Sequence, residues 1–229
     1  MEPNIIFEND KMIICDKPAG VLAQSNRSFD TDMVSALLTY RRAKGENVYI
    51  GVINRLDRPV SGLMVFAKSP ESAAKLNALM QKDTFNKTYT ALVLGSPDKT
   101  GTFTDYIVKD ASGNISRIAD AAEPGSKRAE LSYEVIRTKE IILADRTVSV
   151  SLIKIRLITG RHHQIRVQFA SRGHAVVGDV KYSGGYGGSE FMDELMEVLG
   201  IKHNSIALCA CALDIDGNHF EINADFEKI

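Results

Sequence analysis

The chain has 229 residues, of which 44% are hydrophobic, and its formal net charge at pH 7 is −1. This length suits one large domain or two small ones with a sizeable core. A membrane span is excluded because the sequence has no uncharged apolar run of about 18 residues, and no secretory signal opens it. Its three cysteines are too few for a disulfide framework, so we expect a cytoplasmic protein.

The amino-terminal third predicts short strands and one helix. Residues 5–7 and 12–16 predict two strands joined by a polar turn, and Lys17-Pro18-Ala19-Gly20 predicts a further turn. Thr31 or Asp30 is expected to cap a helix that runs to about Lys44, since apolar residues recur there at helical spacing. Residues 52–53 and 63–67 predict two more strands, joined by a connection over residues 54–62.

Asp57 is the candidate functional residue of that connection. Arg55 and Arg58 flank it, and a nearby guanidinium keeps the pKa of a carboxyl low. A carboxylate that is ionised at neutral pH can act as a nucleophile or a base. The same pattern also occurs in surface turns with a weak ion pair, so the residues of the connection leave both interpretations open.

The middle of the chain predicts scaffold. Ser69 is expected to cap a helix with Pro70 in its first turn, and residues 86–95 predict a strand in which Tyr89 is by periodicity a packing residue. Residues 99–125 are rich in turn formers, with a strand at about 103–108, and read as a variable and mobile segment. Residues 129–138 and 148–157 predict neighbouring antiparallel strands.

The last third contains the second functional candidate. Gly160 and Gly173 bracket a predicted short helix with His162, Arg166 and Phe169 on one side. Six Lys or Arg against one Asp between residues 154 and 181 favour a basic face. A helix at 191–199 and a hairpin of residues 206–215 and 219–222 follow. Neither His162-His163 nor Cys209-x-Cys211 has the further ligands of a metal site, so none is expected.

Five stretches, in this order, resemble the motifs of the RluA family of RNA pseudouridine synthases. They are Asp16-Lys17-Pro18-Ala19-Gly20, Arg55-Leu56-Asp57 with Ser61-Gly62-Leu63, Lys87-Thr88-Tyr89, Gly160-Arg161-His162-His163-Gln164-Ile165-Arg166, and Gly178-Asp179. Five ordered matches are far more specific than any one of them.

The resemblance implies an α+β fold, with a mixed, largely antiparallel β-sheet in two half-domains, flanking helices and a central cleft. We expect one catalytic domain over residues 1–229, without the separate amino-terminal RNA-binding domain that many relatives carry, because there is no room for it before Ile5. The implied reaction converts a uridine of ribosomal or transfer RNA to pseudouridine, and the implied partner is structured RNA. We expect the protein to be a monomer. No cofactor, metal or membrane partner is implied.

The resemblance also implies roles for single residues. Asp57 is the catalytic carboxylate, which acts as a nucleophile or, in a glycal route, as a base. Tyr89 contacts the uracil, and Arg166 pairs with Asp57. Arg55 fills the gap left by a flipped base. The expected RNA-contacting residues are Arg55, Arg58, Arg161, His163, Gln164 and Lys17.

Four positions depart from the family pattern. Asn54 and Gln168 stand where the family has His, and Val60 and His162 stand where it has Thr. These departures motivate an alternative, a catalytically inactive RNA-binding protein of the same fold. Glycoside hydrolysis is discounted because it needs two opposed carboxylates and no second acid near Asp57 suggests itself.

Overall fold

The computed structural model describes residues 1–25, 31–82, 85–110 and 112–228. The described part is a mixed α+β fold in which strands predominate and four α-helices flank them. It divides into two compact units, as expected: unit 1 comprises residues 1–86 and 209–224, and unit 2 comprises residues 87–208 and 225–229.

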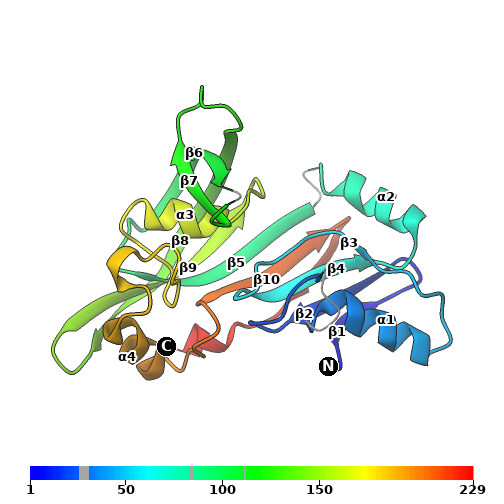
Figure 1. Ribbon diagram of the computed structural model, residues 1–229, viewed down its shortest axis with the longest axis horizontal. Helices are drawn as coiled ribbons and strands as arrows, with labels where there is room; N and C mark the ends of the chain where they lie inside the picture. The colour runs from blue at the N-terminus through cyan, green and yellow to red at the C-terminus, as the bar shows by residue number, and fades with distance from the viewer. Residues whose placement is uncertain (26–30, 83–84, 111, 229) are drawn as a thin grey trace. The chain divides into compact units, whose positions relative to one another are not determined.

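Unit 1 is built on a small mixed sheet (Figure 1). Its strands are adjacent in the order β1 (Asn4–Glu8), β2 (Met12–Lys17), β4 (Ser61–Ala67) and β10 (Leu208–Ile215). β1 with β2 and β2 with β4 are antiparallel, whereas β4 and β10 are parallel. β3 (Gly51–Val52) pairs with β4, and β11 (Asn218–Glu221) forms the predicted hairpin with β10.

Two capped helices lie alongside this sheet. α1 spans Met33–Ala43 and α2 spans Pro70–Leu79. Asp32, not Thr31, is the N-cap of α1, and the alternative Asp30 lies outside the described residues. Asp32 prevails because its carboxylate accepts a hydrogen bond from the backbone of Ser35. α2 begins as predicted, and its Leu76 packs on apolar residues of β2 and β4.

Gly62 allows β4 to approach β10 closely. Its φ is +119°, and a Cβ there would lie 2.5 Å from the backbone nitrogen and oxygen of Ala210. A side chain at this position would therefore push the two parallel strands apart.

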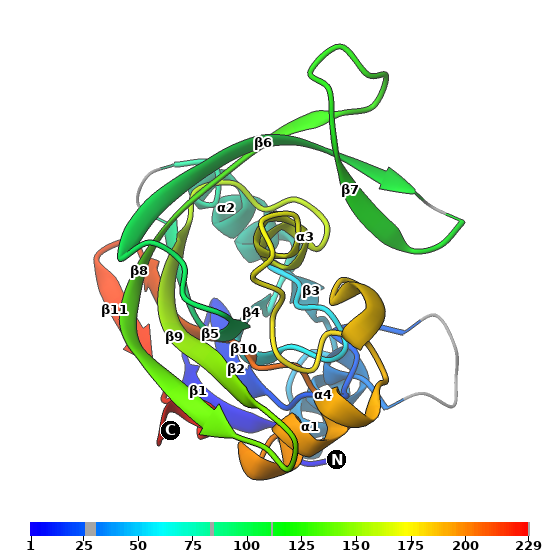
Figure 2. The same cartoon turned by 90° about the vertical axis from the view of Figure 1, so that its left-hand side faces the viewer.

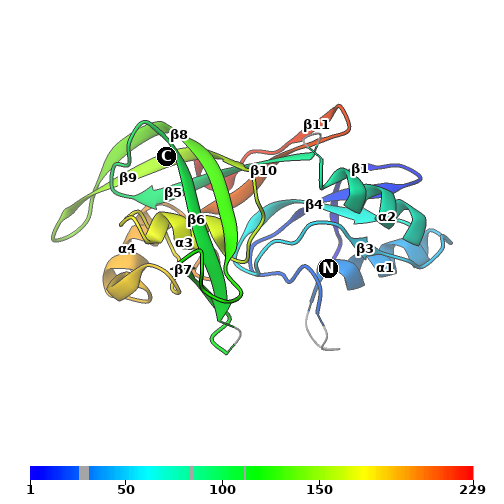
Figure 3. The same cartoon turned by 90° about the horizontal axis from the view of Figure 1, so that it is seen from above.

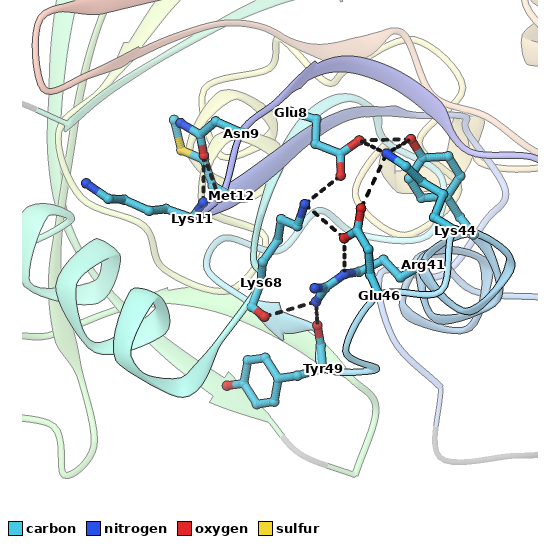
Figure 4. Close-up of polar contacts among 10 residues, drawn as sticks. Glu8, Asn9, Lys11, Met12, Arg41, Lys44, Glu46, Tyr49 and Lys68 are labelled. Carbon is cyan, nitrogen blue, oxygen red and sulfur yellow. Dashed lines mark hydrogen bonds and ion pairs between the residues drawn. The ribbon is translucent and has the colours of Figure 1, made fainter.

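A network of charges, which we call the Glu8 network, ties the end of α1 to β1 and to the end of β4 (Figure 4). It consists of Glu8, Tyr40, Arg41, Lys44, Glu46 and Lys68. Glu8 accepts hydrogen bonds from Lys68 at 2.8 Å and from Tyr40 at 2.8 Å. Burial opposes ionisation of Glu8, but the hydrogen bonds from Lys68, Tyr40 and Lys44 outweigh it and lower its pKa to about 2.

Unit 2 is built on a strongly curved antiparallel sheet (Figure 3). Its strands are adjacent in the order β5 (Phe85–Leu94), β9 (Thr147–Leu157), β8 (Lys127–Ile142), β6 (Thr100–Asp110) and β7 (Ile115–Ala119). β8 and β9 extend the two predicted antiparallel strands. β7 was not predicted: most of residues 99–125 was expected to be a loop, yet β6 and β7 form a hairpin.

Helix α3 (Gln164–Ala170) covers the concave side of the curved strands β6, β8 and β9 (Figure 2). Its Phe169 ring meets Phe103 and Tyr133 edge-on, with ring centroids 4.9 and 5.2 Å away. The helix is shorter than predicted. His163 has a left-handed backbone with φ +52°, so His162 precedes the helix and does not share a helical face with Arg166.

The rest of unit 2 comprises α4 (Glu190–Val198), which matches the predicted helix, and two short 3-10 turns, η1 (Gly184–Tyr186) and η2 (Asp225–Lys228). The three cysteines of the chain are buried thiols. Across the described ranges, we find no helix long and apolar enough to cross a membrane. The same residues contain no cluster of three or more His, Cys, Asp or Glu that could hold a metal ion.

Candidate active-site elements

Residues 54–62 of unit 1, which we call the acid loop and whose last two residues begin β4, present Asp57 at the surface. Leu56 is buried beneath it, Arg55 and Arg58 are exposed on either side, and Asp57 is half-buried. The backbone of Val60 donates to the carbonyl of Asp57 at 3.1 Å and closes a tight turn. The carboxylate therefore sits on a fixed backbone between two solvent-exposed cations.

Asn54 fixes the start of the acid loop. It is buried, its Oδ1 accepts from the backbone nitrogen of Val65 at 2.7 Å, and its Nδ2 donates to the carbonyl of Leu63 at 3.3 Å. Both groups belong to β4, so the side chain pairs with the strand as a backbone amide would. Asn54 thus has a structural function at the position where the family pattern has His.

Lys17 fixes the acid loop at Arg58, from beneath the surface. It is fully buried, and its ammonium donates to the carbonyls of Pro18 at 2.9 Å, Val21 at 2.8 Å and Arg58 at 3.2 Å. Burial lowers the pKa of Lys17 to about 8, although Asp57 and Asp16 favour its charged form. Its three donors all reach protein carbonyls, so Lys17 positions the loop.

A second contact joins the same two loops. The carbonyl of Arg58 accepts from the backbone of Gly20 at 2.7 Å, and Arg58 Nε donates to the carbonyl of Gly20 at 2.9 Å. The Lys-Pro-x-Gly and Arg-Leu-Asp motifs therefore form one structural element. The sequence predicted two separate motifs and gave no sign that they contact each other.

In unit 2, Tyr89 lies on β5 opposite Ile155 of β9 and is 7% exposed. Lys87, two residues earlier on the same face, lies opposite Leu157. The ring of Tyr89 belongs to the packed sheet surface, as its periodicity predicted.

Arg166 projects from α3 and is oriented by a buried ion pair. Its Nε and Nη2 donate to the two carboxylate oxygens of Asp179 at 2.7 and 2.8 Å, and Asp179 is fully buried. The guanidinium carbon also lies 5.1 Å from the centre of the Tyr182 ring. A two-point contact of this kind fixes the plane of a guanidinium. Sequence reasoning gave Asp179 and Tyr182 no such role, although Asp179 is the one acid of that basic segment.

Two stacked histidines connect α3 to β7. The rings of His162 and His163 lie 3.7 Å apart, and His163 Nδ1 is 2.7 Å from the Tyr182 hydroxyl. That hydroxyl accepts from the backbone of Ser116 at 2.7 Å, while His162 Nδ1 is 2.8 Å from Ser116 Oγ. At the position where the family pattern has Thr, His162 therefore reaches the hairpin strand.

Gln164 and Gln168 are both buried and bound to protein. The Gln164 Oε1 accepts from Thr159 Oγ1 at 2.8 Å and from the backbone of Arg161 at 3.0 Å, which closes the turn ahead of α3. Gln168 Nε2 donates to Asp105 at 2.7 Å. Arg161 is exposed and donates through Nε to the carbonyl of Arg128. Gln164 is therefore placed to shape the turn, whereas Arg161 lies at the surface.

Comparison with known proteins bears on the whole arrangement. The model of the RNA pseudouridylate synthase family matches residues 11–171. An uncharacterised RNA pseudouridine synthase of Bacillus subtilis is 35% identical over 80% of this chain and 59% of its own length. The ribosomal large subunit pseudouridine synthase D of Zymomonas mobilis is 33% identical over 78% of this chain and 55% of its own length.

Solved structures show the same fold. Human RNA pseudouridylate synthase domain containing 4 matches with a TM-score of 0.73 and 18% identity, over 96% of this chain and 88% of the human chain. The chain spans about half the length of the curated relatives that it matches. The family match covers most of the chain and includes both the acid loop and α3. The chain therefore belongs to the RNA pseudouridylate synthase family, as its resemblance to the RluA group predicted.

Proposed function

We propose that this protein is an RNA pseudouridine synthase that isomerises a specific uridine of ribosomal or transfer RNA, acting as a monomer in the cytoplasm. The observation that carries the proposal is the acid loop: a half-buried carboxylate on a backbone fixed by Asn54 and Lys17, in a chain of this family. Relatives named for ribosomal RNA and for transfer RNA both match it, which supports this range of substrates.

The reaction breaks the bond between N1 of uracil and the ribose C1′, turns the base and joins C5 to C1′. C5 loses a proton and N1 gains one, so no redox partner or transferred group is required. Asp57 would act as nucleophile at C1′ or as base in a glycal route, and both remain open. A base inside a helix must first be flipped out, at a cost of a few kcal/mol.

The remaining roles are divided between the two units. We propose that Tyr89 holds the uracil ring and that Arg166, oriented by Asp179, keeps Asp57 ionised. Arg55, Arg58, Arg161 and His163 are proposed as RNA contacts, with Arg55 filling the gap left by the flipped base. We assign Lys17 and Gln164 to positioning, since their polar atoms bind protein groups.

The test is to map pseudouridine in total RNA from a strain that lacks the protein, then to complement that strain with variants. We expect at least one uridine to stay unmodified in the deletion strain and with Asp57→Asn. The wild type and Asp10→Asn, a matched exposed carboxylate of unit 1, should restore it. Pseudouridine formation by Asp57→Asn would overturn the assignment.

The binding-only alternative gains no support from the structure. Asn54 and Gln168, two of the departures that motivate it, have buried side chains with protein partners. If the deletion changed no site in the RNA, this alternative would lead, and RNA affinity without turnover would be measured next.

A further inference from the structure

Within the described residues, the half-buried ammonium of Lys87 has no compensating partner. Its side chain is half-buried on β5, yet its ammonium makes no hydrogen bond or ion pair with any residue in the described ranges. Removal from water lowers the pKa of Lys87. A desolvated ammonium without a partner is costly, and such groups are concentrated at functional sites.

The ammonium of Lys87 lies beside the backbone of Gly160, which carries no side chain. A Cβ built on Gly160 would be 3.4 Å from Lys87 Nζ. Apart from Gly160 and its two chain neighbours, no other heavy atom lies within 4 Å of that Cβ. Gly160 leads into Arg161 and α3. The absence of a side chain at residue 160 therefore keeps one side of the ammonium clear.

Among the described residues, the neighbours of Lys87 on the β9 side of the sheet are not acidic. Along the sheet its neighbours are Leu157 of β9 and then Leu131 of β8. Glu130, next to Leu131 on β8, pairs with Arg128 at 2.7 Å. The turn that follows Gly160 contributes the cation Arg161. An apolar floor with two cations and an open side suits an anion supplied from outside.

We propose that Lys87, with the Gly160 turn beside it, binds a phosphodiester of the RNA substrate next to the uracil held at Tyr89. Lys87 and Tyr89 lie on one face of β5, about 7 Å apart along the strand, which is within the reach of one nucleotide. The inference rests on the proposed function and adds a binding subsite to it. Lys87 is a substrate-positioning residue and takes no part in bond making or breaking.

The first experiment observes the lysine directly. Its amine is labelled by reductive ¹³C-methylation, the Lys87 signal is assigned by its loss in Lys87→Arg, and inorganic phosphate or a short oligouridylate is added. We expect both to raise the Lys87 pKa, the RNA at lower concentration. A response to phosphate alone would make this a free-anion site and overturn the RNA assignment, and no response to either would overturn the proposal entirely.

The second experiment measures affinity for labelled oligouridylate as a function of salt. Loss of one phosphate contact should reduce the slope of log affinity against log salt by about 0.7. We expect this for Lys87→Met, with affinity about five- to tenfold lower, whereas Lys87→Arg should keep the wild-type slope. Lys154→Met is the control, since Lys154 is exposed and lies opposite Thr90, on the other face of the sheet. An unchanged slope in Lys87→Met would contradict the proposal.

Gly160→Ala supplies an independent variant. Its nearest contact is an ordinary van der Waals distance and its φ is not in the left-handed region, so the chain should fold, with a methyl group against the ammonium. It should weaken oligouridylate binding in the wild type and add nothing in Lys87→Met. Additive effects would show that the two residues do not form one subsite.

Turnover separates this proposal from the proposed function. With the mapped RNA, Lys87→Met should raise KM about five- to tenfold and leave kcat largely unchanged. An unchanged KM would remove the subsite while the enzyme assignment stands. Pseudouridine formation by Asp57→Asn would remove the enzyme assignment whatever Lys87 does.

Discussion

The acid loop of unit 1 and the arginine of α3 in unit 2 are held in different ways. Neutral backbone groups hold the acid loop: Asn54 pairs with β4, and Lys17 donates to three carbonyls. Arg166 instead depends on a fully buried carboxylate, Asp179. A buried charge becomes costly when its partner is removed, whereas a carbonyl that loses its donor costs less. Removing Asp179 should therefore destabilise the protein more than removing Lys17.

The largest effect is expected for Asp179→Asn. It leaves the buried Arg166 guanidinium without its counter-charge, which should lower the free energy of unfolding by about 3–5 kcal/mol. Urea unfolding at pH 7 measures this. The double variant Arg166→Met with Asp179→Leu removes both charges and should recover much of the loss while remaining inactive. A stable Asp179→Asn would show that the pair does not hold Arg166 in place.

Lys17→Met should destabilise the protein less, by about 2–3 kcal/mol, because it leaves three carbonyls without their donor. Activity should fall as well, since the carbonyl of Arg58, next to Asp57, loses its ammonium. The control is Lys11→Met, at an exposed lysine of the same unit, which should unfold like the wild type. Equal stability of the two variants would contradict the proposed positioning role.

The Glu8 network adds a charge-dependent element to unit 1, at the ends of β1, α1 and β4. Because folding lowers the pKa of Glu8 to about 2, its stabilising effect is present above the usual pKa and disappears as pH falls from about 4.5 to 2. This loss should be on the order of 2 kcal/mol. Unfolding of Glu8→Gln should show a correspondingly weaker pH dependence in that window, and an identical profile would refute the assignment.

The smallest effect is expected for Tyr182→Phe. The ring near Arg166 is kept, but the backbone N–H of Ser116 and the ring of His163 lose the hydroxyl, which should cost about 1 kcal/mol. Tyr186→Phe, at an exposed ring, is the control and should be neutral. Turnover of Tyr182→Phe on the mapped RNA should be close to that of the wild type. A large loss of turnover with only this small loss of stability would show that the hydroxyl also helps to position α3.

Local patterns in the sequence predicted the parts of the fold that depend on near neighbours. The Ser69 cap, the paired strands β8 and β9, the closing hairpin and the exposed setting of the acid loop follow from periodicity and turn residues. The family resemblance predicted the mixed fold and identified the acid loop. The roles of Asp57, Tyr89 and Arg166 stay predictions.

Contacts between distant residues could not be predicted in this way. Lys17 and Arg58 are 41 residues apart, and nothing in either segment specifies that an ammonium will meet that carbonyl. The left-handed backbone of His163 ended the helical pattern early, because periodicity carries no information about a single residue with positive φ. β7 was missed because its five residues are too few to show a clear alternation.

The parallel contact of β4 with β10 at Gly62 also has a consequence for synthesis on the ribosome. Most of unit 2 is one continuous stretch, residues 87–208, whereas the unit 1 sheet needs residues 209–215, which are translated after it. Unit 2 can therefore fold while translation continues. The edge of β4 next to Gly62 must wait for its neighbour, so the unit 1 sheet is completed only after β10 has been translated.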